Sequence, residues 1–128
     1  MIKISHDHPP NWNKLVKLFG VKWEHVVVTY GDTCYCKNYP SPDLIVHETV
    51  HMWQQEIPNR WWKRYYKDSK FRLAQETEAY QEQFKFIRLH VKDRNLLFKI
   101  RDKLALDLSG KMYDKCIDYQ TAFKVIGG

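Results

Sequence analysis

Apolar side chains recur at steps of three or four along most of this chain of 128 residues, which is the spacing of one face of an α-helix. Gly, Pro, Asn and Ser residues lie between these segments, where they end helices or form turns. The pattern predicts helices over residues 11–19, 42–56, 69–91, 95–108 and 119–126. The chain is therefore expected to be mostly helical.

Strand-like segments precede the predicted 42–56 helix. Residues 24–30 and 33–37 are rich in β-branched and aromatic side chains, and the two residues between them, Gly31 and Asp32, suit a tight hairpin turn. Residues 1–4 alternate between apolar and polar and predict a further short strand. The expected fold class is α+β: one mostly helical domain over residues 1–128, with a small antiparallel β-hairpin before the 42–56 helix.

The 42–56 helix carries the most specific motif, in the stretch LIVHETVHMWQQ at residues 44–55. His47, Glu48 and His51 follow the order H-E-x-x-H. On a helix the two histidines lie one turn apart, with Cβ atoms about 5–6 Å from each other, so both imidazoles can reach one metal ion. Glu48 is offset from them, beside the open position of such a metal. This placement is suited to a general base that takes a proton from water.

A zinc ion in a hydrolytic site has three protein ligands and an open fourth position. The 69–91 helix offers the third ligand on its inward stripe, which consists of Leu73, Glu76, Tyr80, Phe84 and Ile87. Glu76 lies on this apolar stripe, whereas Glu78 lies on the opposite, charged side. A buried carboxylate is costly unless it is paired or binds a metal. The periodicity therefore favours Glu76 over Glu78 as the third ligand.

The helix ends and the remaining apolar positions complete these predictions. Asn11 and Ser41 are candidate N-caps for the 11–19 and 42–56 helices, and Asp118 is the candidate for the last helix. On the 42–56 helix, apolar side chains beside the histidines form a second stripe that we expect to pack in the core, made of Val46, Val50 and Trp53.

With these residues the chain resembles the zincin metallopeptidases, specifically the gluzincins. It also resembles small metallopeptidases of phages and bacteria, in which an H-E-x-x-H-x-x-Q-Q helix precedes an E-x-E-A-Y helix and an LSG...Y segment. The corresponding segments here are HETVHMWQQ, ETEAY and LSGKMYDK, so the resemblance covers roughly residues 40–128. It implies a zincin-like peptidase domain with one zinc ion bound by His47, His51 and Glu76, with Glu48 as general base and a peptide or protein as substrate.

The sequence departs from the larger gluzincins at one position. These often have an aspartate four residues after the third ligand, where this chain has Tyr80. Hydrogen-bonded support for a ligating histidine is therefore not identified from the sequence. The group that would stabilise the oxyanion is also left open among Tyr66, Arg72, Tyr80, His90 and Tyr113.

The formal net charge of +6 is unevenly distributed. Residues 59–72, NRWWKRYYKDSKFR, interleave basic and aromatic side chains, which is a pattern that can bind a nucleic-acid backbone and stack on bases. The favoured interpretation is an aromatic core with a solvated basic rim, because the segment contains no recognised nucleic-acid motif. The alternative function is a basic, metal-stabilised binding module for nucleic acid or a partner protein, without catalytic turnover.

Three cysteines, Cys34, Cys36 and Cys116, form no disulfide framework and are typical of a reducing compartment. No apolar segment approaches the roughly 20 residues that span a bilayer. We therefore expect a cytoplasmic protein of a bacterial cell or phage-infected host, with no membrane partner. Cys34 or Cys36 is the candidate for a fourth protein ligand that would close the metal site. His6 and His8 are either a second metal site or, as we favour, an exposed loop pair.

Overall fold

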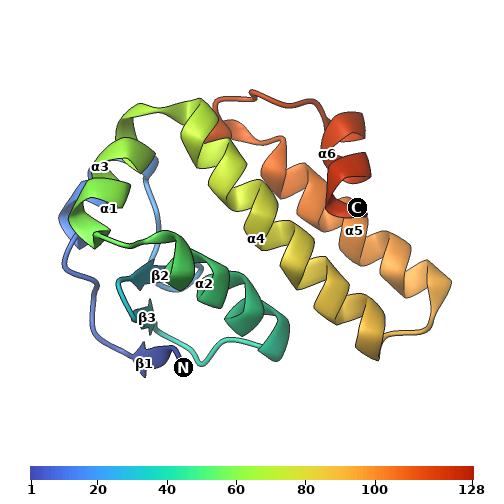
Figure 1. Cartoon of the computed structure of the whole chain (residues 1–128), viewed down its shortest axis with the longest axis horizontal. Helices are drawn as coiled ribbons and strands as arrows, with labels where there is room; N and C mark the ends of the chain where they lie inside the picture. Colours follow the sequence, from blue (N-terminus) through green and yellow to red (C-terminus); the bar gives the residue numbers. More distant parts are fainter.

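The computed structural model describes residues 1–128 and has six α-helices, three strands and one short 3-10 helix (Figure 1). The strands are β1 (Lys3–Ser5), β2 (Val27–Tyr30) and β3 (Thr33–Cys36). The helices are α1 (Trp12–Phe19), α2 (Pro42–Gln54), α3 (Pro58–Lys67), α4 (Ser69–His90), α5 (Arg94–Leu108), η1 (Lys111–Tyr113) and α6 (Tyr119–Ile126). The predicted α+β class, mostly helical with a hairpin before the motif helix, is confirmed.

The three strands form one mixed sheet in the order β1-β3-β2. β2 and β3 are the predicted antiparallel hairpin, and Gly31 in its turn has a φ of 65°, a conformation that glycine adopts without steric cost. β1 pairs in parallel with β3, so the sheet is mixed. Both hairpin strands are shorter than predicted, since residues 24–26 precede β2 and Lys37 follows β3. The order leaves β2 at an edge of the sheet.

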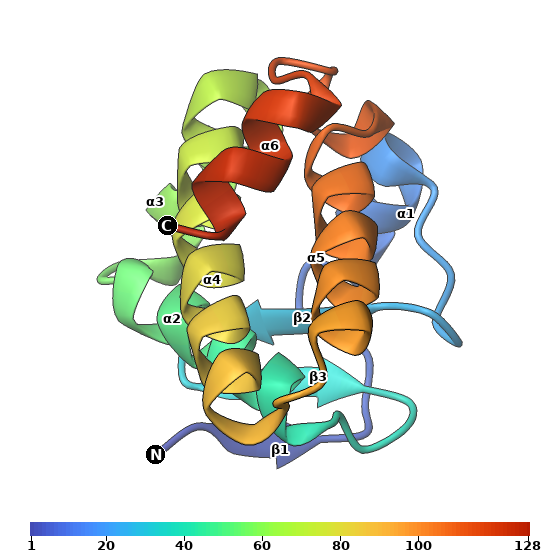
Figure 2. The ribbon, with the colours of Figure 1, turned by 90° about the vertical axis from the view of Figure 1, so that its right-hand side faces the viewer.

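α4 is the central helix of the domain and packs against α2, α3, α5 and α6. In Figure 2, α4 and α5 stand side by side with α6 across them, and the sheet lies behind their lower halves. Three core clusters hold the domain together, the smallest of them formed by Ile2, Cys34 and Cys36 in the sheet region. The largest, between α4, α5, η1 and α6, consists of Phe84, Ile87, Leu104, Ala105, Leu108, Tyr113, Ala122 and Ile126. The second joins α1, β2 and α3 through Leu15, Val28, Trp61, Trp62 and Tyr65.

The basic aromatic segment forms α3, a helix that the sequence pattern did not predict. Pro58, expected only to end the preceding helix, is the first residue of α3, a position where proline needs no main-chain N–H donor. Trp61, Trp62 and Tyr65 are buried in the core, and the lysine and arginine side chains of this helix are exposed. The interpretation as an aromatic core with a basic rim is confirmed for α3, whereas Arg72, the last residue of the segment, is buried on α4.

All three predicted residues hold the N-cap position of their helix, but only Asp118 makes a capping hydrogen bond. The Asn11 side chain donates to the Tyr66 hydroxyl (2.8 Å), and the Ser41 hydroxyl donates to the Asp43 carboxylate (2.6 Å), so neither caps a main-chain N–H. Each side chain donates a hydrogen bond to another side chain and does not accept one from a main-chain N–H at the start of its helix. Asp118 caps α6 as predicted, by accepting from the main-chain N–H of Thr121.

The apolar stripe predicted to pack in the core, Val46, Val50 and Trp53 of α2, is wrong at one position. Val50 is buried, Val46 is half-buried, and Trp53 is 73% exposed. The reason is that α2 lies between the sheet and α4, where its buried positions are taken by His47, Glu48 and His51. Trp53 lies beyond these contacts. No helix of the chain combines the length and apolar composition that crossing a membrane requires.

Truncation of Leu108 should destabilise the domain, because this side chain is fully buried in the largest core cluster. We expect Leu108→Ala to lower the free energy of unfolding by about 2–5 kcal/mol in urea denaturation. Leu106 lies on the same helix and is 56% exposed, so Leu106→Ala should change the free energy of unfolding by only about 0.5 kcal/mol. Equal effects of the two substitutions would contradict this assignment of the core.

Candidate metal centre

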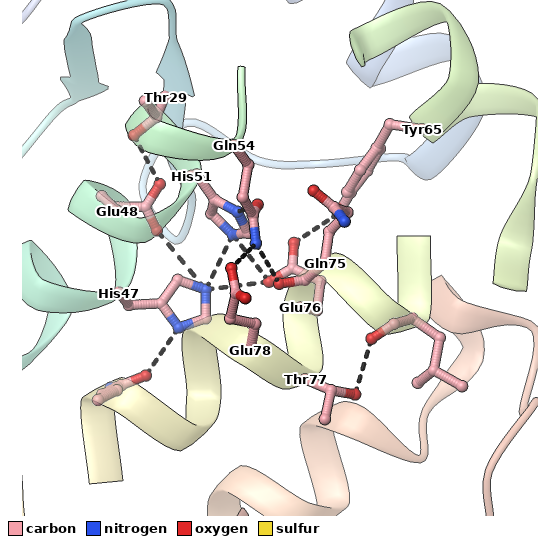
Figure 3. Close-up of polar contacts among 12 residues, drawn as sticks. Thr29, His47, Glu48, His51, Gln54, Tyr65, Gln75, Glu76, Thr77 and Glu78 are labelled. Atoms are coloured by element: carbon pink, nitrogen blue, oxygen red, sulfur yellow. Dashed lines mark hydrogen bonds and ion pairs between the residues drawn. The ribbon is translucent and has the colours of Figure 1, made fainter. Parts of the chain in front are cut away.

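The packing of α2 against α4 brings the two halves of the predicted site together (Figure 3). α2 contributes His47, Glu48 and His51, and α4 contributes Glu76. All four residues are buried, with 5–6% of their surface exposed. Glu78, on the outer side of α4, is exposed, so the expected difference in burial between the two glutamates is confirmed.

The donor atoms of His47, His51 and Glu76 converge on one point. Glu76 Oε1 lies 2.9 Å from His47 Nε2 and 3.0 Å from His51 Nε2, and the two Nε2 atoms are 3.2 Å apart. Zinc bonds of about 2.0–2.1 Å in tetrahedral geometry separate ligand atoms by about 3.3 Å. The three atoms therefore form a triangle of the size of one face of such a tetrahedron, and they can hold one metal ion.

The charges of Glu76 and the two imidazoles are coupled. Burial by itself would lower the pKa of His51, but the Glu76 carboxylate raises this pKa to about 9. Burial would conversely raise the pKa of Glu76, and the adjacent His51 and His47 hold it well below its ordinary value. Without a metal, a proton bound at His51 thus neutralises the buried carboxylate.

Glutamine side chains accept hydrogen bonds from the outer nitrogens of both imidazoles. His47 Nδ1 donates to Gln83 Oε1 (2.9 Å), and His51 Nδ1 donates to Gln54 Oε1 (2.8 Å). Neither glutamine was predicted as a partner of these histidines. Gln54 belongs to the Q-Q pair of the H-E-x-x-H-x-x-Q-Q pattern, so the sequence pointed to it. Gln83 lies 36 residues from His47, and no motif marks it.

Two tyrosines support the same group in different ways. The Tyr65 hydroxyl donates to Glu76 Oε2 (2.7 Å), so the other oxygen, Oε1, is left to face the imidazoles. Tyr80, four residues after Glu76, packs edge-on against the His47 ring with centroids 4.6 Å apart. Tyr80 therefore restrains His47 by packing, and the hydrogen bond comes from Gln83 instead.

Glu48 is oriented by the sheet. The Thr29 hydroxyl of β2 donates to Glu48 Oε1 (2.9 Å), which leaves Oε2 on the side of the triad, 3.9 Å from His47 Nε2. Burial raises the pKa of the Glu48 carboxyl above its ordinary value. Glu48 is thus a buried base beside the three converging atoms but outside their triangle.

The other predicted ligands do not join this site. The triad is the only group of at least three His, Cys, Asp or Glu residues with potential ligand atoms within 4.8 Å of one another. Cys34 and Cys36 are buried free thiols on β3, and the structure gives no support for either as a fourth ligand. His6 Nδ1 donates to the main-chain carbonyl of Cys36 (2.9 Å), and His8 stacks on Trp12. These two histidines are exposed, as favoured.

The triad lines a cleft of about 940 Å³. Its lining includes the edge strand β2 with residue 26 before it, and the segment of α5 from Lys99 to Asp107. Tyr80, His90 and Tyr113 also line the cleft, whereas Tyr66 and Arg72 do not. Three of the five candidates for oxyanion stabilisation therefore have access to it.

One part of the β2 edge is already occupied. The Gln55 side chain donates to the Thr29 carbonyl and accepts from the Gly31 N–H, both at 2.8 Å. Gln55 thereby makes the two contacts that a neighbouring strand would make. Main-chain N–H and C=O groups alternate in direction along a strand, so those of Val27 point to the same edge as those of Thr29. The Gln55 amide does not contact Val27, so this part of the edge is not occupied by it.

Comparisons with protein-family models, curated proteins and solved structures found no match to this chain. Its functional interpretation therefore rests on its own residues and their geometry.

The first prediction for this site separates the two glutamates of ETEAY. Glu76→Gln removes the charge that faces both imidazoles and should weaken zinc binding more than about 100-fold, beyond the range typical of residues that only support ligands. Glu78→Gln is the matched control, because Glu78 is exposed, is not one of the converging ligand residues, and a glutamine in its place keeps an acceptor for Gln54. Competition with a fluorescent chelator measures both affinities, and equal losses would contradict the assignment.

A second prediction concerns pH. The raised pKa of His51, about 9, means that zinc must displace a proton at neutral pH. Zinc affinity should therefore rise about tenfold per pH unit until the pH reaches about 9 and then level off. Calorimetry in buffers of different ionisation enthalpy should detect about one proton released per zinc at pH 7. An affinity that does not vary with pH would contradict this.

Proposed function

We propose that this protein is a zinc-dependent peptidase of the gluzincin type. The observation that carries the proposal is the buried Glu48 carboxylate, held beside three converging ligand atoms in an open cleft. A purely structural zinc site is closed by four protein ligands, whereas a catalytic site has three and an open position. Here only three protein ligand atoms converge, which supports the catalytic alternative.

The residues fit the chemistry of peptide hydrolysis. When bound, zinc supplies Lewis acidity that lowers the pKa of water to about 7 and polarises a carbonyl. Glu48 Oε2 accepts the proton from the attacking water, because Thr29 fixes the opposite oxygen. The same carboxyl then delivers this proton to the leaving amine. Burial, which raises the pKa of Glu48, makes it a stronger base for the first transfer and a competent acid for the second.

The cleft supports an extended peptide as the substrate. β2 is an edge strand, and an extended peptide can add to such an edge through main-chain hydrogen bonds. Gln55 occupies the edge at Thr29, so the main chain of the peptide would pair with β2 at Val27. More than half of the residues that line the cleft are apolar, which favours apolar side chains near the cleaved bond. The free thiols support an enzyme that acts in the reducing cytoplasm.

The alternative of a nucleic-acid-binding module has less support. Stacking on bases needs exposed aromatic faces. The aromatic residues of α3 at positions 61, 62 and 65 are instead buried in the core. We therefore retain the peptidase as the proposed function.

Replacement of the base tests the proposal directly. Glu48→Gln preserves the shape of the side chain and removes its ability to take a proton, so peptide hydrolysis should fall by at least about 100-fold. Zinc content, measured by atomic emission, should stay at one ion per chain, because Glu48 is outside the ligand triangle. Full activity of this variant, or loss of its zinc, would refute the assignment.

A further inference from the structure

We propose that Gln54 and Gln83 are positioning residues that fix both ligand imidazoles as Nδ1–H tautomers, so that both Nε2 lone pairs point at the same place. The inference rests on the proposed function only in taking zinc as the metal. It assigns a role to Gln54 of the Q-Q pair and to a glutamine that no motif identifies.

The orientation of the Gln54 amide is fixed by its outer contacts. Its Nε2 donates to the main-chain carbonyl of Gln75 (3.0 Å) and to the Glu78 carboxylate (2.9 Å). Both partners are acceptors only, so a flipped amide would place oxygen against oxygen at two positions. Gln54 Oε1 must therefore face His51, and this oxygen accepts only from a protonated Nδ1.

The Gln83 amide is fixed in the same way by a charged group. Its Nε2 donates to Asp43 Oδ2 (2.8 Å), and Asp43 Oδ1 in turn accepts from the Ser41 hydroxyl. The interactions with Gln83 and Ser41 help to lower the pKa of Asp43 against the effect of its burial, so it remains an acceptor. Gln83 Oε1 must then face His47, whose Nδ1 is the donor.

The consequence lies on the inner side of the rings. A neutral imidazole with a proton on Nδ1 carries its lone pair on Nε2. The two Nε2 atoms, 3.2 Å apart, and Glu76 Oε1 are then three acceptors that no protein donor satisfies when both rings are neutral. The two amides thus hold the site in the form that binds a cation, and both are uncharged, so they add no charge next to it.

Zinc affinity tests the role of each amide. Gln54→Leu and Gln83→Leu should each weaken zinc binding about 10–100-fold. Gln81→Leu is the matched control, since Gln81 lies on α4, donates to the Val125 carbonyl (2.9 Å) and does not contact the triad. Melting temperatures of the metal-free proteins correct for any loss of folding. Affinities equal to that of the Gln81 variant would overturn the inference.

An exchange of charge between Gln83 and Asp43 separates positioning from packing. Gln83→Glu alone sets two carboxylates against each other and should weaken zinc binding. Adding Asp43→Asn restores a donor to that contact, keeps an acceptor for His47, and should return the affinity to within about threefold of the original protein. Failure of the double variant to recover while it remains folded would count against the role of Gln83.

Nitrogen-15 NMR of the imidazoles measures the tautomers without reference to catalysis. The original protein should show slowly exchanging Nδ1–H protons on His47 and His51, both with zinc and without it. The Leu variant of each glutamine should lose this protection on its own histidine. An unprotonated Nδ1 in the metal-free protein would overturn the inference even if zinc binds. Absence of zinc binding by a protein with both Nδ1–H protons would refute the proposed function alone.

Discussion

The structure depends on the pairing of one buried carboxylate with two imidazoles between α2 and α4. Removing Glu76 from water costs several kcal/mol unless its oxygens are satisfied. Without a metal, the Tyr65 hydroxyl and a protonated His51 satisfy them, and burial of Glu76 with His47 and His51 requires that the two helices stay in contact. The core cluster behind α4 supplies the apolar burial that holds this helix in place. Stability therefore comes from the apolar side of α4, and chemistry from its polar positions.

The sequence predicted the parts of the site that follow from helical periodicity. A step of 3.6 residues places His47 with His51 on one side of α2 and places Glu76 inward on α4, which is where the structure has them. The same reasoning failed for Trp53, which is exposed although it continues an apolar stripe. Periodicity identifies a helix face, but the neighbouring elements decide how far along that face burial extends.

The supporting contacts were not predictable because they join residues far apart in the chain. Thr29 and Glu48 are separated by 19 positions, and Gln83 and His47 by 36. Threonine in a strand and glutamine in a helix are ordinary residues, and nothing in their local sequence specifies a partner. α3 escaped prediction for a different reason, since its proline was taken only as the end of α2. A proline that ends one helix can also start the next.

The C-terminal end of α2 connects the candidate metal ligands to the sheet. Gln54 supports His51, and the adjacent Gln55 binds the edge of β2 at Thr29. Thr29 uses its side chain to hold Glu48, so its main-chain and side-chain groups both contact α2. A shift of β2 relative to α2 would therefore move the base with respect to the triad. Because the proposed substrate binds this same strand, the contacts that place a peptide in the cleft also determine where Glu48 lies.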